Sequence, residues 1–347
     1  MKSEVTKEKQ VSPSKIMQVG LGFWSSKILL SAVNMGVFTL LAKEELSGQN
    51  IMKQLNLHER GLYDFLDTLV SLNFLERKGL KESSIYSNTE ETDMFLDKNK
   101  ASYIGGMLEL ANNRLYSYWN TLEDGLKTGI PQNELKNGGT TIFEDVHSDP
   151  QKLKEFLQAM EGLQRFNFIA LSKKFDFNNY KTHCDVGGSL GQLALQIALD
   201  HNHMKCITFD LPQLESVAKN NILSTGLGDR VSVYSGDFFK DEFPKADVIT
   251  MGNVLHNWGL EDKKTLIKKA FAALPKRGAL IVIENIIDDD RRTNSFGLMM
   301  SLQMLIETSS GYDFTAADFT VWAKQIGFSE ISKIPLTGST SAIIAIK

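Results

Sequence analysis

An apolar run that ends in a glycine-rich turn constrains the fold of this chain more than any other feature. Residues 183–191 read His-Cys-Asp-Val-Gly-Gly-Ser-Leu-Gly, and the next apolar run carries Asp210, which follows Gly187 by 23 residues. A strand that enters such a turn lets the backbone approach a ligand closely, and an acid at the tip of the next strand can accept hydrogen bonds from ribose hydroxyls. We therefore expect a βαβ unit in a parallel sheet, with a site for a nucleotide-type cofactor.

The spacing of the glycines favours one class of cofactor over another. The dinucleotide pattern G-x-G-x-x-G, begun at Gly187, requires glycines where Ser189 and Gln192 stand, so NAD is disfavoured. The pattern acidic-x-Gly-x-Gly-x-Gly, used by enzymes that bind S-adenosylmethionine, is matched at Asp185, Gly187 and Gly191, with Ser189 as the one departure. A plain turn between a strand and a helix is the alternative interpretation of the same residues.

Composition and charge are those of an ordinary globular chain. Its 347 residues are 42% hydrophobic and 23% charged, which is enough for two domains with sizeable cores. The net charge is −4 and no block of Lys or Arg occurs, so we expect no nucleic-acid partner. Cys184 and Cys206 lie in apolar runs, which suits a reduced, cytoplasmic protein. We expect no membrane segment, because no uninterrupted apolar stretch approaches a bilayer-spanning length.

Residues 1–100 show the pattern of short amphipathic helices followed by a hairpin, which is typical of a winged helix. The hairpin would pair residues 75–80 with residues 84–87. Such a module raises the question of DNA binding. The helix that would read the DNA carries Glu59, Asp64 and Asp67, and these acids would repel phosphates. We therefore do not expect this module to bind DNA.

The remaining chain divides into a helical connector and an α/β domain. Residues 101–180 are predicted to be mostly helical, with a polar loop at 127–141, and could line an acceptor pocket. Residues 181–347 alternate apolar strands with helices. The predicted fold is a mainly α, winged-helix-like domain followed by an α/β, Rossmann-like domain with a doubly wound, mostly parallel sheet.

Polar residues follow several of the predicted strands. Asp237 and Phe238 come after the strand at 231–234, where an adenine could pair with the acid and pack on the ring. The alternative is a turn whose aspartate caps the next segment and whose phenylalanine belongs to the core. The preceding glycine turn favours the ligand-binding interpretation.

His256 is the candidate general base. It follows the strand at 248–251, and ligands of open α/β sheets bind at the carboxyl ends of the strands. Glu284 at the end of a strand and Asp313 in a later loop could join it, although each alone could be a surface acid. A phenol is mostly protonated at neutral pH, so a neutral imidazole would assist methyl transfer by taking its proton. A carboxylate on the other ring nitrogen would fix the tautomer.

Methionines at helical spacing mark a candidate acceptor pocket. Met300 and Met304 stand on the predicted helix 295–308, and Met160 stands on an earlier helix. Flexible, polarizable thioethers suit a flat aromatic acceptor, although such residues also fill ordinary cores. No cluster of metal ligands is expected.

Seven short motifs occur in an order and spacing that accident does not explain. They are Asp185-Val-Gly-Gly188, Phe209-Asp-Leu-Pro212, Gly236-Asp-Phe238, Val254-Leu-His-Asn-Trp258, Ala273-Leu-Pro275 with Gly278, Ile283-Glu284 and Gly327-Phe328. Together they resemble the small-molecule O-methyltransferases, a family that includes plant caffeate-type enzymes, acetylserotonin O-methyltransferase and bacterial polyketide-tailoring relatives. The likeness covers nearly the whole chain.

The resemblance implies S-adenosylmethionine as cofactor and a small, phenolic acceptor. It also implies that His256 is the base flanked by Glu284 and Asp313, and that the amino-terminal module is a homodimerisation domain that closes part of the partner's acceptor pocket. The residues that match the family's cofactor contacts are Gly187, Asp210, Asp237 and Phe238.

Four positions depart from the family's pattern. Ser189 and Leu190 stand where the family usually keeps a third glycine and a polar residue, so the turn or the cofactor affinity could differ. Asn257 replaces the aspartate after the histidine, which would turn an acceptor contact into a neutral amide contact that can also donate. Asn253 stands near the place of an Arg or Lys beside the cofactor.

The leading hypothesis is O-methyl transfer to a hydroxyl of a small aromatic or polyketide-like acceptor. The same fold could instead methylate nitrogen or carbon, or act as a non-methylating relative. A winged-helix regulator that senses S-adenosylmethionine is a further alternative, and it predicts salt-sensitive binding to specific DNA. An NAD-dependent oxidoreductase is disfavoured by the glycine spacing.

Overall fold

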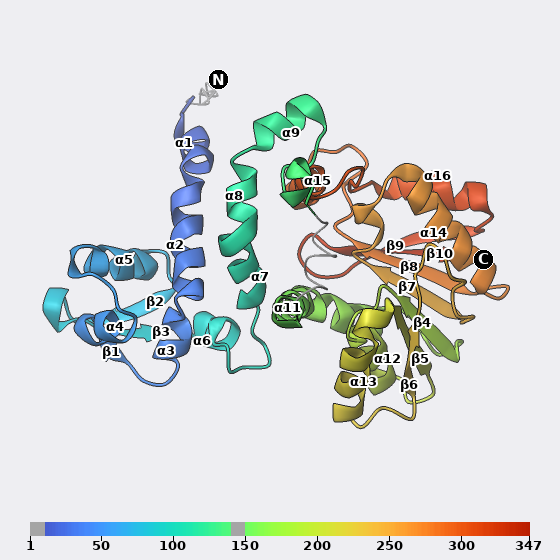
Figure 1. Ribbon diagram of the computed structural model, residues 1–347, viewed down its shortest axis with the longest axis horizontal. Coiled ribbons are helices and arrows are strands. Elements are labelled where there is room, and N and C mark those ends of the chain that lie inside the picture. The colour runs from blue at the N-terminus through green and yellow to red at the C-terminus, as the bar shows by residue number, and fades with distance from the viewer. Residues whose placement is uncertain (1–10, 140–149) are drawn as a thin grey trace, which may run out of the picture. The chain divides into compact units, whose positions relative to one another are not determined.

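The computed structural model describes residues 11–139 and 150–347. These residues form two compact units, one ending at Leu115 and the other beginning at Tyr116 (Figure 1). The division into parts at about 100 and 180 stays a prediction. Each unit is described by itself below.

The amino-terminal unit consists of short helices around a small antiparallel sheet of order β1-β3-β2. Its core includes Phe38, Leu66 and Tyr86, all fully buried. The Tyr86 hydroxyl donates to Asp67 Oδ1 over 2.8 Å, and Arg77 Nη1 lies 2.7 Å from the same oxygen. The elements are α1 (Ser14–Gly20), α2 (Gly22–Asn34), α3 (Val37–Leu41), β1 (Leu46–Ser47), α4 (Gly48–Gln54), α5 (Glu59–Ser71), β2 (Leu75–Lys78), β3 (Ile85–Asn88), α6 (Glu90–Leu96), α7 (Gly105–Leu110) and a π-helical turn (Ala111–Leu115).

The order of helices α4 and α5 followed by the β2–β3 hairpin agrees with the elements expected from the sequence. The winged-helix interpretation of this order stays a prediction. Asp67, one of the acids of the expected DNA-reading helix, is engaged by Tyr86 and Arg77 within the unit. This aspartate therefore has a structural role.

Helices α1 and α2 leave large apolar side chains uncovered within the unit. Ile16, Val19, Phe23 and Trp24 are between 52% and 75% exposed. By length and composition the segment 14–34 could cross a membrane, although Lys15 and Lys27 interrupt its apolar residues, so it contains no uninterrupted apolar stretch of that length. Length and composition alone do not distinguish a membrane helix from a helix whose apolar face is covered by another protein chain.

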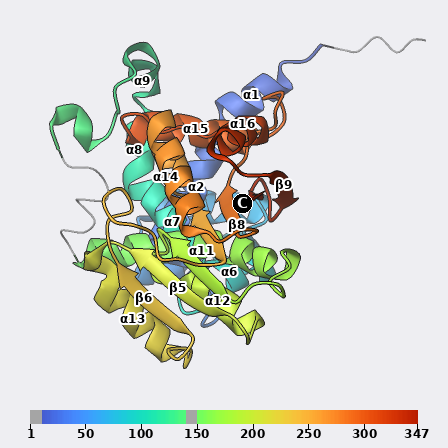
Figure 2. The ribbon, with the colours of Figure 1, turned by 90° about the vertical axis from the view of Figure 1, so that its right-hand side faces the viewer.

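The carboxyl-terminal unit is built on a seven-stranded sheet of order β6-β5-β4-β7-β8-β10-β9 (Figures 1 and 2). The first five strands in this order are parallel, and β10 and β9 are antiparallel to their neighbours. The predicted doubly wound, mostly parallel sheet is confirmed. The strands are β4 (Thr182–Val186), β5 (Lys205–Asp210), β6 (Val231–Ser235), β7 (Val248–Gly252), β8 (Ala279–Glu284), β9 (Glu330–Pro335) and β10 (Ser341–Ile346).

Helices cover both faces of this sheet. One apolar core contains residues of α14 and α16, and a second contains residues of α11, α12 and α13. In β8, Leu280 and Val282 belong to the first core, and Ile281 and Ile283 to the second, so the strand is apolar up to Glu284 at its end. The helices are α8 (Tyr116–Trp119), α9 (Leu122–Thr128), α11 (Pro150–Lys174), α12 (Gln192–Asp200), α13 (Glu215–Ser224), α14 (Leu260–Ala273), α15 (Ser295–Glu307) and α16 (Ala316–Ile326).

The strand order reverses its direction between β4 and β7. Strands β5 and β6 continue the sheet on one side of β4, whereas β7 and β8 continue it on the other. In doubly wound sheets, ligands bind in the crevice outside the carboxyl ends of the strands at this switch point. The turn that begins at Gly187 follows β4, and the segment that begins at Asn253 follows β7. Both therefore meet at the place where a ligand is expected.

Candidate active site

The glycine turn after β4 is closely packed against the segment after β7. Gly187 has a φ of +73°, and a Cβ added to it would lie 2.6 Å from Val254 Cγ2. Its N–H donates to Phe209 O over 2.9 Å, which fixes the turn on the neighbouring strand. Gly191 also has a positive φ, of +80°. A side chain at Gly187 would therefore push the two loops of the crevice apart.

Asp210 and Ser189 interact directly across the crevice. Asp210 Oδ2 accepts a hydrogen bond of 2.8 Å from the Ser189 N–H, and Oδ1 accepts one of 2.7 Å from the Leu211 N–H. Ser189 has a φ of +51°, so the serine that departs from the family's pattern adopts the left-handed conformation that glycine favours. A carboxylate oxygen can accept more than one hydrogen bond, as binding of ribose hydroxyls by Asp210 would require.

Asn253 brings a polar atom that lacks a partner in the described chain. Its Oδ1 is buried without a hydrogen bond, and its backbone, with a φ of +53°, donates to Ile283 O over 3.0 Å. A buried amide oxygen without a partner is costly unless a ligand supplies a donor. This oxygen and the close approach at Gly187 together fit a polar cofactor at the switch point.

Asp237 and Phe238 follow β6, as expected, but each already has contacts. Asp237 Oδ2 lies 2.9 Å from Lys240 Nζ, and this ammonium holds the pKa of the carboxyl below its usual value. The Phe238 ring makes edge contacts with the rings of Phe239 and Trp258, at centroid distances of 4.9 and 5.9 Å. Phe238 is thus held in an aromatic cluster next to the segment that carries His256.

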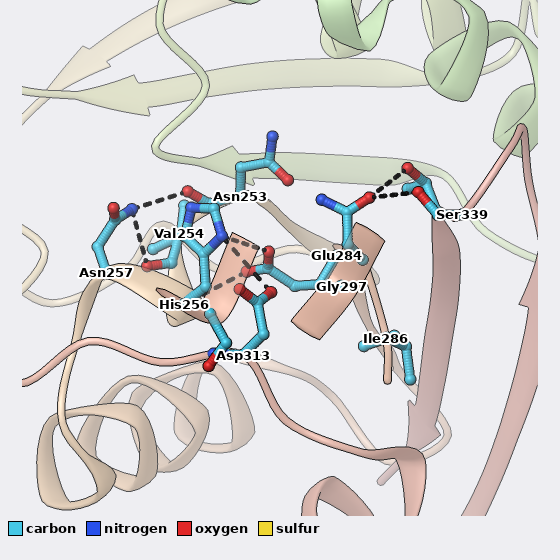
Figure 3. Close-up of polar contacts among 12 residues, drawn as sticks. Asn253, Val254, His256, Asn257, Glu284, Ile286, Gly297, Asp313 and Ser339 are labelled. Atoms are coloured by element: carbon cyan, nitrogen blue, oxygen red, sulfur yellow. Dashed lines mark hydrogen bonds and ion pairs between the residues drawn. The ribbon is translucent and has the colours of Figure 1, made fainter. Parts of the chain in front are cut away.

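His256 lies between two buried carboxylates, as Figure 3 shows. It stands on a 3-10 turn (Leu255–Asn257) that begins three residues after β7, and its Nδ1 is 3.3 Å from Glu284 Oε2 and 3.7 Å from Asp313 Oδ1. The His256 backbone N–H also donates to Glu284 Oε1 over 3.2 Å. The second distance is that of an ion pair and exceeds hydrogen-bond length. The three residues that the sequence analysis selected are therefore brought together.

The electrostatics of this cluster are set by burial and charge together. His256 is 6% exposed, Asp313 is 2% exposed and Glu284 is fully buried. Burial raises the pKa of Glu284 to about 7, although the imidazole opposes this shift. Burial alone would lower the pKa of His256, but the charges of Glu284 and Asp313 outweigh it and raise that pKa above its usual value. The imidazole is therefore a stronger base than a free histidine.

The same three side chains offer ligand atoms that lie within 4.8 Å of one another. Histidine and carboxylate groups at such distances could surround a cation. The expectation that the site holds no metal stays a prediction.

Asn257 uses its amide to stabilise the turn that carries His256. Its Nδ2 donates to Asn253 O over 2.9 Å and lies 3.4 Å from Val254 O (Figure 3). An aspartate could not donate these bonds. The departure from the family's aspartate therefore has a local structural reason, and the expected contact between Asn257 and an acceptor stays a prediction.

Helix α15 carries two of the methionines expected to contact an acceptor. Met304 is buried and Met300 is half-buried, and α15 packs against the turn that carries His256. The Asp313 N–H donates to Ser301 Oγ over 3.1 Å, which joins this helix to the cluster. Met160 is half-buried on α11. The contacts of these methionines with an acceptor stay a prediction.

A polar network that the sequence analysis missed holds α15 in place. The Trp119 indole N–H donates to Gln303 Oε1 over 2.5 Å, and Gln303 Nε2 donates to Glu307 Oε1 over 2.9 Å. Asn133 Nδ2 donates to Glu307 Oε2 over 2.9 Å. Two residues of the predicted connector, Trp119 and Asn133, are thus fixed to the methionine-bearing helix.

A second residue that the sequence analysis missed is Lys263 on α14. It is fully buried, and its Nζ donates to Trp258 O over 2.5 Å. Four lysines stand at 263, 264, 268 and 269, and the sequence contains no signal that separates the buried one from the others.

A hollow of about 480 Å³ lies at the opposite edge of the sheet. It is lined by residues 172–178 together with Asp200 and His201. Residues 172–178 precede β4, and Asp200 and His201 precede β5, so the hollow adjoins the starts of these strands. It is therefore separate from the crevice at their carboxyl ends.

The chain matches two known domain families along its length. Residues 119–329 match the O-methyltransferase domain, and residues 17–98 match the O-methyltransferase dimerisation domain. The tetracenomycin polyketide synthesis 8-O-methyl transferase TcmO of Streptomyces glaucescens is 34% identical over 96% of this chain and 97% of that protein. The N,N-dimethyltransferase OxyT of Streptomyces rimosus is 30% identical over 79% of this chain and 78% of that protein.

A solved structure with the same architecture contains a bound cofactor. The structure of human N-acetylserotonin methyltransferase in complex with S-adenosylmethionine superposes with a TM-score of 0.89. It is 26% identical and covers 99% of both chains. The likeness therefore extends through both units, including the carboxyl ends of the sheet.

Proposed function

Because this chain belongs to the S-adenosylmethionine-dependent O-methyltransferase family, we propose that His256 is the general base for methylation of an acceptor hydroxyl. The observation that carries the proposal is the pair of buried carboxylates at Nδ1 of this histidine. A proton on Nδ1 faces these carboxylates, which leaves the Nε2 lone pair as the proton acceptor. The geometry thus favours the tautomer that a base requires.

The protein's own contribution is alignment and proton removal. The cofactor supplies an electrophilic methyl group carried on a sulfonium. Gly187, Asp210 and Asn253 would hold the cofactor at the switch point, with Asp237 and Phe238 at the adenine end. His256 would take the acceptor's proton at Nε2 as the new bond forms, and Glu284 and Asp313 would stabilise the resulting imidazolium. Alignment of the reacting atoms is expected to be the larger part of the rate gain.

The acceptor is proposed to be a small aromatic or polyketide-like molecule with a phenolic hydroxyl. Its proposed place is beside α11 and α15, the helices that carry Met160, Met300 and Met304. The relative TcmO is named for methylation of a polyketide, which supports this acceptor class. A phenol has a pKa of about 10, so a base with a raised pKa is well matched to its proton.

The protein is proposed to work as a homodimer in the cytoplasm. The match to the O-methyltransferase dimerisation domain begins within α1 and includes all of α2, and these helices carry exposed apolar side chains such as Val19 and Trp24. Burial of this surface against a second copy would be favourable. Cys184 and Cys206 are buried free thiols, which is consistent with a reducing compartment.

Methylation of nitrogen is the second candidate activity. The relative OxyT, 30% identical over 79% of this chain, is named an N,N-dimethyltransferase, so the family relationship alone does not fix the acceptor atom. An amine whose lone pair is free needs no base to attack the methyl group. Dependence of the reaction on His256 therefore distinguishes the two activities.

The test is transfer of a labelled methyl group to a panel of acceptors. The protein is incubated with methyl-labelled S-adenosylmethionine and with phenols, hydroxyquinones, amines and carboxylic acids, and product masses are followed. We expect label on a phenolic oxygen, and we expect His256→Ala to lower turnover by roughly 100-fold to 10,000-fold. Cofactor binding, measured by calorimetry, should remain nearly unchanged in this variant.

His203→Ala is the matched control, because His203 is exposed and lies two residues before β5, away from the carboxyl ends of the strands. It should methylate at the wild-type rate. Label on an amine with unchanged turnover in His256→Ala would support nitrogen methylation and remove the base assignment. Tight cofactor binding without transfer to any acceptor would favour a sensor or a non-methylating relative.

A further inference from the structure

A lysine lies fully buried beside the His256 cluster. Lys263 stands in the first turns of α14, and 0% of its surface is exposed. Its Nζ donates to Trp258 O over 2.5 Å and lies 3.4 Å from the centre of the Tyr312 ring. Burying an ammonium without compensation is costly, so each of these contacts contributes to keeping it there.

Each contact connects Lys263 to a segment that carries a group of the cluster. Trp258 follows His256 by two residues, and Tyr312 immediately precedes Asp313. One ammonium therefore joins the turn of the base to the loop of the second carboxylate. No other residue of α14 is positioned this way by the contacts of the described chain.

A cation also offsets the charge that the cluster carries when both of its acids are ionised. With a neutral imidazole, the carboxylates of Glu284 and Asp313 would place two negative charges in a buried site. Lys263 reduces this total to one, and a proton taken up by His256 brings it to zero. Neutrality after proton transfer is favourable at low dielectric, because unpaired buried charge is expensive.

We propose that Lys263 is a positioning residue of the methyl-transfer site, which holds the His256 turn to the Asp313 loop and supplies a positive charge beside the base and its two acids. The proposal rests on the proposed function of His256, which it deepens by adding the cation of the cluster. Lys263 acts through these groups and needs no contact with the acceptor.

Several ionisable groups lie around Lys263. His256 on its turn, Glu284 at the end of β8 and Asp313 in the loop before α16 lie on the elements packed against it, and Asp262 is its neighbour on α14. Burial lowers the pKa of Lys263 to about 8, although the three acids oppose this shift. The ammonium in turn lowers the pKa values of both His256 and Glu284. Loss of its charge should therefore move protonation of the cluster to higher pH.

The primary test measures the titration of His256 by NMR and needs no acceptor. The full chain is labelled with ¹³C and ¹⁵N in its six histidines, and the His256 signal is assigned with His256→Gln. Lys263→Met removes the charge and the donor, whereas Lys263→Gln removes the charge and keeps a donor for Trp258 O. Lys264→Met is the control, since Lys264 is partly exposed and lies 3.5 Å from Glu261.

We expect the His256 ring to titrate about one pH unit higher in Lys263→Met and in Lys263→Gln, the size expected for one charge lost beside a buried site. The other histidines and the Lys264→Met protein should titrate as in wild type. An unchanged His256 titration in either folded Lys263 variant would overturn the proposal. A shift in Lys263→Met but not in Lys263→Gln would show that the lost hydrogen-bond donor, and not the lost charge, changes the titration. This result would also contradict the proposal.

A kinetic test separates this role from ordinary structural support. With a phenol that the acceptor panel identifies, the acid limb of kcat/KM should move up by about one pH unit in Lys263→Gln, so activity at pH 7 falls roughly tenfold. Near pH 9 the wild-type lysine is itself mostly neutral, so the two proteins should converge. An equal loss of kcat/KM at every pH would mean that Lys263 only supports the structure, which would contradict the proposal. If no acceptor is methylated, the proposed function fails while the NMR titration still decides the role of Lys263.

Discussion

At the scale of single residues, the two carboxylates give His256 different support. Glu284 contacts both the ring and the backbone of His256, with Oε2 at 3.3 Å from Nδ1 and Oε1 accepting the backbone N–H. Asp313 contacts only the ring, at 3.7 Å. Glu284 therefore positions the turn and orients the imidazole, whereas Asp313 mainly adds charge. This asymmetry predicts that Glu284 matters more for the rate.

Substitution of Glu284 by glutamine should shift the pH profile in the direction opposite to that for Lys263. The charge of Glu284 raises the pKa of His256, so the neutral amide should let His256 stay unprotonated to lower pH. The acid limb of kcat/KM should move down, while the plateau falls about 10-fold to 100-fold because the imidazolium loses a partner. The pH dependence of methyl transfer measures both effects. Glu330→Gln, at the exposed start of β9, is the control.

A plateau at the wild-type level in Glu284→Gln would show that the carboxylate does not support the base. An acid limb that stays in place would show that its charge does not act on His256. Either result would contradict the role proposed for Glu284.

The sequence identified the members of the cluster unequally. His256 and Glu284 could be predicted because each stands at the carboxyl end of a strand, and such ends meet at one edge of a parallel sheet. Asp313 lies in a loop, so no strand end fixed its place; it was a candidate from the sequence, and the family resemblance then supported the assignment. Lys263 could not be predicted, because its burial depends on how α14 packs against Trp258 and Tyr312.

At the scale of elements, the turn between β4 and α12 limits what the cofactor crevice can accept. Gly187 and Gly226 have nearly the same backbone, with φ of +73° and +72°. A Cβ at Gly187 would lie 2.6 Å from Val254 Cγ2, whereas a Cβ at Gly226 would meet no atom within 4 Å. Alanine substitutions at these two glycines therefore separate the cost of a left-handed backbone, which both share, from the cost of crowding, which only Gly187 has.

Substitution of either glycine by alanine should cost about 1–2 kcal/mol of stability through the backbone conformation alone. Gly187→Ala should in addition displace the segment after β7 and weaken S-adenosylmethionine binding at least about tenfold, since a crowded crevice must open to relieve the contact. Thermal unfolding and calorimetric titration with the cofactor measure the two effects. Equal cofactor affinity in both variants would show that the turn does not shape the crevice.

The sheet itself was only partly predictable. Strands β4, β5, β7 and β8 follow from continuous apolar runs, which are typical of parallel strands buried on both faces. The antiparallel edge was missed. β9 reads Glu-Ile-Ser-Lys-Ile-Pro with mostly exposed residues, and β10 lies between β8 and β9, an order that no local pattern encodes.

At the scale of the whole molecule, the amino-terminal helices carry a surface that a single chain leaves uncovered. Val19 and Trp24 are 73% and 57% exposed, in a segment that matches the O-methyltransferase dimerisation domain. A helix within α2 was expected from the sequence and α1 was not, and the exposure of their apolar side chains could not be predicted, because it depends on which face the unit's own core covers. A second copy of the chain is the proposed partner for this face.

Substitution of Trp24 by aspartate should therefore convert a dimer to a monomer. In a homodimer each substitution acts twice, so two carboxylates would enter the interface without partners, and loss of two large aromatic side chains would add to the cost. Size-exclusion chromatography with light scattering should give the mass of two chains for the wild type and of one chain for Trp24→Asp. Circular dichroism should remain the same, because Trp24 is exposed within its own chain.

Leu223→Asp, at a 69% exposed position on α13, is the control and should stay dimeric. A wild-type monomer, or a Trp24→Asp protein with the mass of two chains, would show that this face has a different partner.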